Sequence, residues 1–146
     1  MARKTKEEAQ ATRAQIIDAA RRVFHAEGVN RSSLEKVAKA AGVTRGAVYW
    51  HFENKAALFL AVRQTYLCRL IVLSAILDEQ RGDRSPLDTV TDYLRALFRE
   101  LLGDPPLRET LEIIMLRCEY VDEFHKVLEI INEPFAEVLS AFQSLY

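Results

Sequence analysis

A cluster of hydroxyl, basic and aromatic side chains between positions 44 and 55 has the residue types that bind nucleic acid. Basic side chains neutralise phosphates, and hydroxyl and backbone N–H groups bind phosphate oxygens. The members of this cluster are Thr44, Arg45, Gly46, Tyr49, Trp50, His51 and Lys55. A glycine inside a helix costs about 1 kcal/mol relative to alanine, so Gly46 needs a reason, and the close approach of a phosphate or a base edge is one.

The surrounding sequence predicts a helix-turn-helix that presents this cluster. Ser32 and Glu35 have the spacing of a capping box at the start of a helix of about nine residues, which ends at Gly42. Thr44 is the predicted N-cap of the second helix. Ala38 is expected to let the second helix approach closely, and Val37, Val43 and Val48 to fill the angle between the two helices. A generic helical hairpin shows the same pattern, and only the outer face of the second helix favours nucleic acid.

Apolar residues recur at intervals of three and four along nearly the whole chain, which predicts an all-α fold. The helices expected outside the cluster cover about residues 5–26, 55–78, 86–103, 107–120 and 122–146, with Pro134 kinking or dividing the last. Residues 80–84 are the clearest predicted loop, and Asn54 and Ser85 are predicted helix caps. The helix from Lys55 is apolar around much of its circumference, as expected of a central helix.

The charge of the chain is divided unevenly along its length. The 146 residues carry a net charge of -1, with 49% hydrophobic and 28% charged residues, as in an ordinary globular protein. Residues 1–55 hold 11 Lys or Arg against 6 Asp or Glu, whereas residues 56–146 hold 9 against 15. The positive segment favours a polyanionic partner, and the negative remainder keeps the rest of the chain away from one.

Several classes of protein are excluded by what the sequence lacks. Cys68 and Cys118 have neither CxxC spacing nor an adjacent histidine, so we expect two reduced core residues in a cytoplasmic protein, without a metal site. The longest uncharged apolar stretch, residues 70–77, is far shorter than the roughly 20 residues that span a bilayer. His25 and His125 have no recognisable nucleophile or carboxylate partner, so we expect no enzyme and no cofactor.

The segment from Leu34 to Leu58 resembles the DNA-binding domain of the TetR family of bacterial repressors. The resemblance rests on residues 42–52 (GVTRGAVYWHF), followed by Asn54, Lys55, Leu58 and Phe59. Residues 1–8 and 112–120 resemble the branch typified by AcrR and TtgR, which controls multidrug efflux pumps. The resemblance implies a DNA-binding domain at 1–54 and a helical domain at 55–146 that binds a small ligand and dimerises.

The resemblance also implies a role for each DNA-binding position. Arg45 matches the position that reaches guanine in the major groove, and Lys55 matches a phosphate contact. The remaining implied contacts are hydroxyl donors at Ser33 and Thr44, phosphate or thymine contacts at Tyr49 and His51, a mixed role at Trp50, and close approach at Gly46. Plain packing remains the alternative for Tyr49 and Trp50. A basic arm at Arg3, Lys4, Lys6 and Arg13 either binds DNA or is a charged, frayed terminus.

For the C-terminal domain the resemblance implies a pocket for a small hydrophobic or amphipathic effector. The candidate lining residues are Tyr66, Leu67, Leu70, Phe98, Met115 and Cys118. Ordinary core packing is the alternative for each of them. The helix from Lys55 would act as the lever that joins ligand binding to DNA binding.

The expected protein is a repressor that binds a palindromic operator as a homodimer, does not enter membranes, and leaves the operator when the effector binds. Family members carry two further helices, which form most of the dimer interface, whereas this chain ends at Tyr146. Either the chain is truncated, or further residues complete it, or it pairs through another face. A helical ligand-binding or protein-interaction module without repressor activity is the alternative function.

Overall fold

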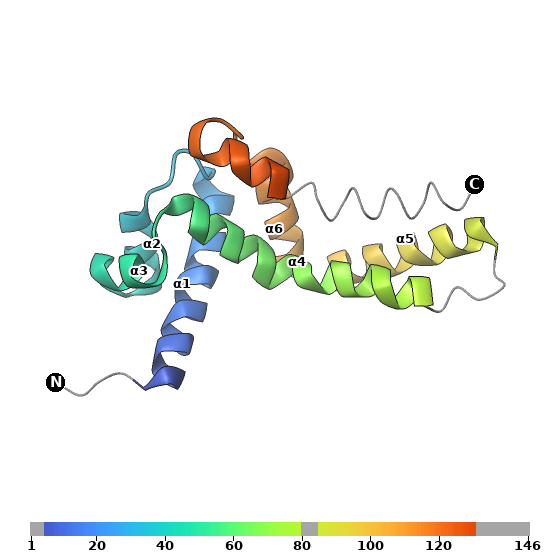
Figure 1. Ribbon diagram of the computed structural model, residues 1–146, viewed down its shortest axis with the longest axis horizontal. Helices are drawn as coiled ribbons and strands as arrows, with labels where there is room; N and C mark the ends of the chain where they lie inside the picture. Colours follow the sequence, from blue (N-terminus) through green and yellow to red (C-terminus); the bar gives the residue numbers. More distant parts are fainter. Residues whose placement is uncertain (1–4, 80–84, 131–146) are drawn as a thin grey trace. The chain divides into compact units, whose positions relative to one another are not determined.

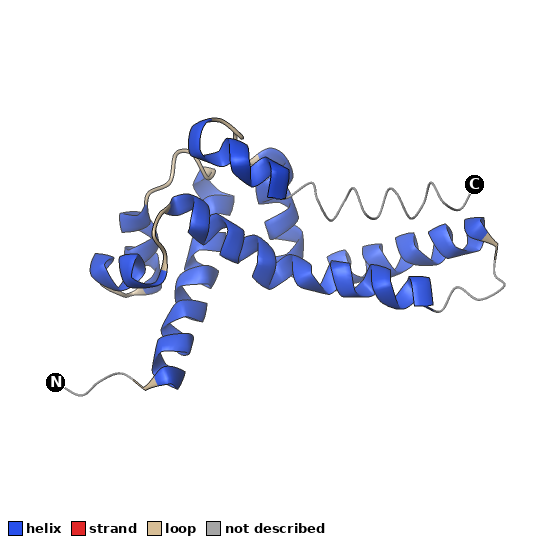
Figure 2. Cartoon of the chain, viewed as in Figure 1, coloured by secondary structure: helices blue, strands red, loops and turns tan. Residues whose placement is uncertain are grey.

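The computed structural model describes residues 5–79 and 85–130, with only the backbone described for residues 69–79 and Pro86. The regular structure of these residues is helical (Figures 1 and 2). The helices are α1 (Lys6–Glu27), α2 (Leu34–Ala41), α3 (Arg45–His51), α4 (Lys55–Glu79), α5 (Pro86–Gly103) and α6 (Pro105–Leu116), followed by a 3₁₀ turn (Asp122–Phe124) and helical residues 125–130. The predicted all-α fold is confirmed.

Side-chain caps define most of the helix starts. Thr5 caps α1 in a capping box with Glu8, a signal that the sequence analysis overlooked. The predicted caps Thr44, Asn54 and Ser85 each accept a hydrogen bond from a backbone N–H three residues on, which confirms them. Each hydroxyl or amide oxygen therefore satisfies one of the donors that a helix start leaves without a partner.

The start of α2 differs from the prediction by one residue. Ser33, not Ser32, is the N-cap, and it accepts a hydrogen bond from the backbone N–H of Lys36 at 3.3 Å. Ser32 is buried and donates its hydroxyl to the carbonyl of Val29 at 2.7 Å. The predicted capping box of Ser32 with Glu35 is therefore wrong, because the preceding turn takes the Ser32 hydroxyl.

The end of α6 also differs from the prediction, which extended it to Tyr120. The helix ends at Leu116, and the backbone beyond it bonds to the turn after α1. Val29 donates its N–H to the carbonyl of Arg117 at 2.8 Å, and the Asn30 side chain bonds both backbone groups of Glu119. These bonds replace the next helical turn. The predicted loop at 80–84 and the predicted kink at Pro134 lie outside the described residues.

The chain forms two compact units, each with its own interior. The N-terminal unit comprises residues 1–65 with 109–119, and the second unit comprises residues 66–108 with 120–146. The interior of the N-terminal unit includes Ile16, Ala20, Phe24, Val37, Val48, Leu58, Phe59 and Ile113. The unit boundary thus falls within α4 and again near the start of α6. The functional division at residue 55 remains a prediction.

The two cysteines lie in surroundings that differ from the prediction. Cys68 is exposed and Cys118 is half-buried, so the expectation that both are core residues is wrong. In α4 the buried stripe passes through Leu67, and Cys68 lies about 100° further round the helix.

Within the described residues, no helix has the length and apolar character needed to cross a bilayer.

Candidate nucleic-acid interface

The turn between α2 and α3 has the geometry that a helix-turn-helix requires. Gly42 has a φ of 67°, in the left-handed region that glycine adopts without a side-chain clash. Its N–H bonds the last turn of α2, and the N–H of Val43 donates to the carbonyl of Ala38 at 3.0 Å. Val37 and Val48 are fully buried and Val43 is half-buried. The turn therefore holds α3 across α2, as predicted.

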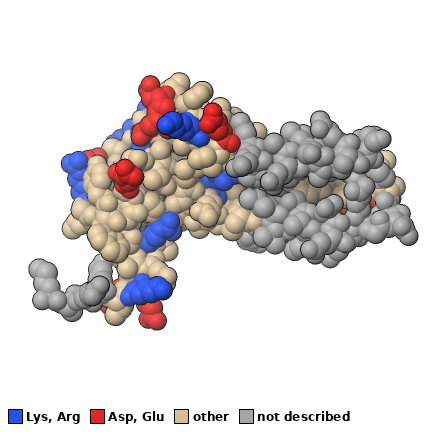
Figure 3. Space-filling view, viewed as in Figure 1, with Lys and Arg blue, Asp and Glu red and all other residues tan. Residues whose placement is uncertain are grey.

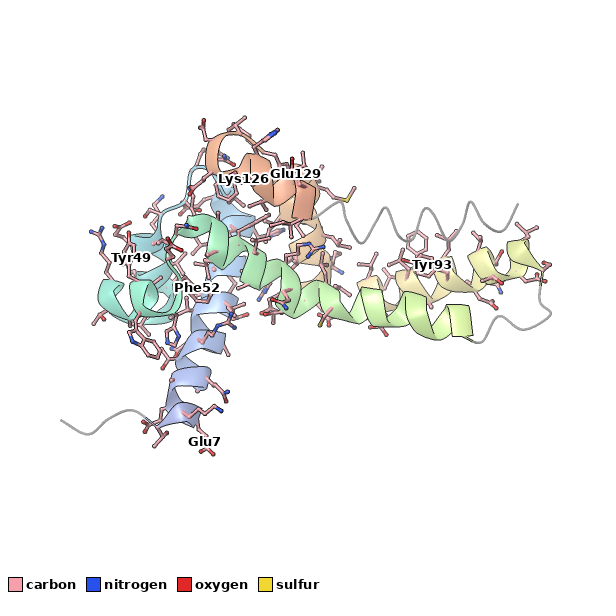
Figure 4. The ribbon with its side chains drawn as sticks, viewed as in Figure 1. Glu7, Tyr49, Phe52, Tyr93, Lys126 and Glu129 are labelled. Atoms are coloured by element: carbon pink, nitrogen blue, oxygen red, sulfur yellow. The ribbon has the colours of Figure 1, made fainter. Side chains whose placement is uncertain are left out.

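The α1 helix fixes this pair of helices from the other side. The amide nitrogen of Gln15 donates to the carbonyl of Ala41 at 2.6 Å, so α1 binds the end of α2. Phe52, just after α3, is buried, and the guanidinium of Arg13 lies 5.1 Å from the centre of its ring. Figure 4 shows Phe52 beside α1 and Tyr49 farther from it. Phe52 is therefore part of the core of this unit, and Arg13 lies against its ring.

The outer face of α3 presents large polar and aromatic side chains. Trp50 is 73% exposed, and Tyr49 is also exposed. His51 is half-buried, with its ring edge-on to Trp50 and the ring centres 4.5 Å apart. Two large aromatic side chains that stay exposed to solvent give up most of the stabilisation that burial would provide, which favours a binding role over the packing alternative.

Arg45 lies on this face in a defined environment. Its Nε is 3.1 Å from Oε1 of Glu35 on α2, and its guanidinium lies 5.3 Å from the centre of the Tyr49 ring. A hydrogen bond from the Glu35 backbone N–H, the Ser33 hydroxyl and the charge of Arg45 together hold the pKa of Glu35 below its ordinary value. The hydrogen bond to Tyr49 and, as the next largest cause, the negative charge of Glu35 raise the pKa of Arg45. Both side chains are therefore fully charged at neutral pH.

Gly46 has space for a larger residue in this chain. A Cβ at Gly46 would have Thr44 Oγ1, at 3.9 Å, as its nearest neighbour, which is an ordinary contact. The packing of the chain itself therefore does not explain why a glycine occupies this helical position. The close approach of a phosphate or a base to Gly46 remains our prediction.

We expect Gly46→Ala to stabilise the protein and to weaken DNA binding. Alanine is favoured over glycine in a helix by about 1 kcal/mol, whereas the added methyl group would displace a closely approaching phosphate or base. Urea unfolding and fluorescence anisotropy with a DNA duplex measure the two effects. Gly103→Ala is the matched control, since a Cβ at Gly103 would have no neighbour within 4 Å and this glycine lies at the end of α5. Unchanged DNA affinity of Gly46→Ala would contradict the close approach.

Lys55 occupies a different environment from the one its predicted role suggests. Its ammonium donates to the carbonyl oxygens of Asn30 and Ser32, at 3.1 Å each. The start of α4 is thereby bound to the turn between α1 and α2. Lys55 thus has a structural role in positioning α2, and the phosphate contact implied by the resemblance stays a prediction.

Contacts between α1 and α6 form a second polar cluster, which the sequence analysis did not find. Arg21 is buried and forms ion pairs with Asp18 and with Glu109. His25 Nε2 lies 2.6 Å from Oε2 of Glu112, so this histidine has a carboxylate partner after all. The partners are almost ninety residues apart, and neither periodicity nor a motif links them. Their effect is to tie α6 to the helix that supports α2.

The six predicted ligand-binding residues lie in dissimilar surroundings. Leu67 is buried, Tyr66 and Cys118 are half-buried, and the side chain of Leu70 is outside the described part of the chain. Phe98 is 60% exposed and Met115 is 75% exposed. Met115 is exposed although Ile113 and Ile114 before it are buried, because each further residue turns about 100° round the helix.

The described residues show an apolar depression along one face of α5. Its volume is about 580 Å³, and its lining residues are Thr91, Leu94, Arg95, Phe98, Arg99 and Leu102. Of the predicted ligand-binding residues whose side chains are described, only Phe98 contributes to this depression. The ligand-binding role of all six residues remains a prediction.

The surface of the N-terminal unit carries charges of both signs. On the face shown in Figure 3, basic and acidic side chains lie interspersed rather than in one basic patch. The ion pairs of this unit include Lys36 with Glu27 and Arg22 with Asp18. The excess of basic residues in the first 55 positions therefore does not form a uniform patch on that face.

Two short helices joined by a positive-φ glycine turn, the second with an exposed basic and aromatic face, define a helix-turn-helix protein. Residues 16–62 match the model of the tetR family of bacterial regulatory proteins. The transcriptional repressor BepR of Brucella suis biovar 1 (strain 1330) is 38% identical over 98% of this chain and 68% of its own length. The chain therefore belongs to the TetR family, whose members are transcriptional regulators and not enzymes.

Other relatives agree in sequence and in fold. The transcriptional regulator TtgR of Pseudomonas putida is 43% identical over 127 residues, and the match covers 87% of this chain. The chain spans 60% of the length of TtgR. The structure of SmeT with triclosan has a TM-score of 0.72 and 35% identity, covering 90% of this chain and 62% of SmeT. SmeT is the repressor of the Stenotrophomonas maltophilia multidrug efflux pump SmeDEF.

Proposed function

We propose that this chain is a ligand-responsive transcriptional repressor of a multidrug efflux operon, which acts in the cytoplasm. It binds a palindromic operator as a homodimer and leaves it when a small hydrophobic or amphipathic compound binds. The observation that carries the proposal is the exposed face of α3, where Arg45, Tyr49 and Trp50 lie beside a glycine with space around it. The control of an efflux pump by SmeT supports the choice of operon.

The dimensions of α3 suit insertion into the major groove. An α-helix with its side chains is about 10–12 Å in diameter, which fits a major groove about 12 Å wide, and the seven residues of α3 extend about 10 Å along it. Arg45 would contact O6 and N7 of guanine, and Thr44 and Tyr49 would contact the flanking phosphates and thymine methyl groups. Since so short a helix reads only a few base pairs, two copies on a palindrome would supply the remaining specificity.

The effector site belongs to the same proposal. Triclosan, which SmeT binds in its solved complex, has the small, apolar character that we propose for the effector of this chain. We place the site among Tyr66, Leu67, Leu70, Phe98, Met115 and Cys118. Unbranched methionine and large aromatic side chains repack around ligands of different shapes.

Two helices connect the units and provide the route for coupling. α4 and α6 each have residues in both units. Lys55 binds the first of them to the turn before α2, and Arg21 and His25 bind the second to α1. A ligand that shifts either helix would therefore displace the support of α2 and α3, and ligand and operator would weaken each other's binding by the same factor.

We expect triclosan and operator DNA to bind antagonistically. The operator is first obtained by selecting duplexes from a randomised pool with the chain, and its affinity is then measured by anisotropy with and without triclosan. Typical coupling of about 1 to 3 kcal/mol would weaken operator binding about 5- to 150-fold. Calorimetry of triclosan with and without saturating operator checks the reciprocal effect.

The possible outcomes separate the proposal from its alternative. If the chain selects no duplex but binds triclosan, it is a ligand-binding module without repressor activity. If it selects a duplex and triclosan binds equally well with and without that DNA, the inducible mechanism is wrong for this compound. A second, unrelated amphipathic compound then distinguishes a wrong effector from absent coupling.

A further inference from the structure

The carboxylate of Glu35 lies on the proposed DNA-binding face, where a negative charge opposes phosphate. Glu35 is in the first turn of α2, and its side chain is half exposed. Its Oε1 lies 3.1 Å from Nε of Arg45 across the turn between α2 and α3. We propose that Glu35 is a specificity-determining residue, which orients the guanidinium of Arg45 for a base contact and penalises non-specific phosphate contacts. This inference rests on the proposed function.

The contact with Glu35 leaves the base-reading edge of Arg45 available. A guanidinium has five N–H donors, one on Nε and two on each terminal nitrogen. Oε1 of Glu35 forms an ion pair with the guanidinium on its Nε side, and Nη2 lies 3.5 Å from the hydroxyl oxygen of Tyr49. A bidentate contact with O6 and N7 of guanine needs two donors from the terminal nitrogens. The two partners therefore restrain the plane of the guanidinium while the terminal nitrogens still carry the donors for guanine.

The negative charge of the Glu35 carboxylate does not depend on Arg45 alone. The Ser33 hydroxyl, at the N-cap of α2, and the Glu35 backbone N–H also stabilise its charged form. The start of a helix favours a negative charge in any case. Glu35 therefore keeps its negative charge whichever way the guanidinium of Arg45 turns.

The same charge changes how the surface responds to different DNA sequences. Phosphates occur in every duplex, so a carboxylate on this face weakens binding to all of them. Only a duplex with a guanine in register gains the oriented contact of Arg45. Specificity is the difference between the affinities for two duplexes. A carboxylate that repels every duplex therefore increases specificity when the guanine contact of Arg45 compensates for the repulsion in one duplex alone.

The test compares affinities for the selected duplex and for a random duplex of equal length, at matched salt. We expect Glu35→Gln, which keeps the shape and removes the charge, to bind the random duplex more tightly. We expect the ratio of the two affinities to fall about fivefold, the low end of the contribution of one bidentate contact. The matched control is Glu53→Gln, since Glu53 is an exposed carboxylate of the same unit that follows α3. It should change both affinities equally and leave the ratio unaltered.

A double-mutant cycle separates an oriented contact from a general charge effect. In an Arg45→Ala background, Glu35→Gln should no longer lower the affinity ratio, because no guanidinium remains to be oriented. Thermal unfolding of each variant confirms that it is folded, and Glu35→Ala provides a second removal of the charge if the glutamine variant is unstable. An unchanged ratio in the folded single variants, or a fall that persists without Arg45, overturns the inference while leaving the proposed function intact. If the wild-type chain selects no DNA sequence, both this inference and the proposed function are wrong.

Discussion

Arg45→Ala is expected to weaken binding to the selected operator duplex by about 1 to 3 kcal/mol, or about 5- to 150-fold. Binding to a random duplex should change far less, because a base contact contributes only where the matching guanine is present. The side chain is exposed, and its charged neighbour is Glu35, so its removal leaves no buried group without a partner. Fluorescence anisotropy at matched salt with both duplexes measures the difference.

Lys55→Ala is the contrasting variant for that experiment. Its ammonium binds two carbonyl groups of the turn before α2, so its loss should disturb the whole interface and weaken both duplexes alike. If Arg45→Ala instead lowers the two affinities by equal factors, Arg45 contacts phosphate and not a base. The operator must then be read by another residue of α3.

Phe59→Ala is expected to lower the free energy of unfolding of the N-terminal unit by about 3 to 5 kcal/mol. Phe59 is fully buried in α4, and its ring centre lies 6.3 Å from that of Phe24 in α1. Truncation removes a large apolar group and leaves a cavity between the helix that supports α2 and the helix that follows α3. Native-state hydrogen exchange of the α1 amides reports the opening of this unit specifically.

Phe98→Ala is the matched control, because it makes the same truncation at a side chain that is 60% exposed on α5. Its effect on stability should stay within about 0.5 kcal/mol. If the two variants destabilise the α1 amides equally, the contact between Phe24 and Phe59 does not hold the N-terminal unit together. A large loss of stability confined to Phe59→Ala would also lower DNA affinity, since only the folded unit presents α3.

Local signals in the sequence were sufficient for the all-α fold and for most helix boundaries. A cap or a glycine acts within one turn of the backbone, so Thr44, Asn54, Ser85 and Gly42 could each be interpreted from their immediate neighbours. The helix-turn-helix is predictable for the same reason, since its turn and its valines lie within a short segment. Ser32 shows the limit, because two adjacent serines offered the same cap and a tertiary turn chose between them.

The sequence by itself determined which residue types α3 carries, whereas only the tertiary structure decided what surrounds them. Glu35 faces Arg45 because a left-handed glycine turns one helix across the other, and no local pattern indicates that pairing. Lys55 binds a backbone carbonyl of the turn before α2, and His25 lies against the carboxylate of Glu112 in α6. The periodicity of the sequence indicates neither contact. Met115 is exposed because successive apolar residues point to different sides of a helix, and only one side of α6 is buried there. Helix formation depends on interactions three and four residues apart, while the environment of a side chain depends on segments that are distant in the chain.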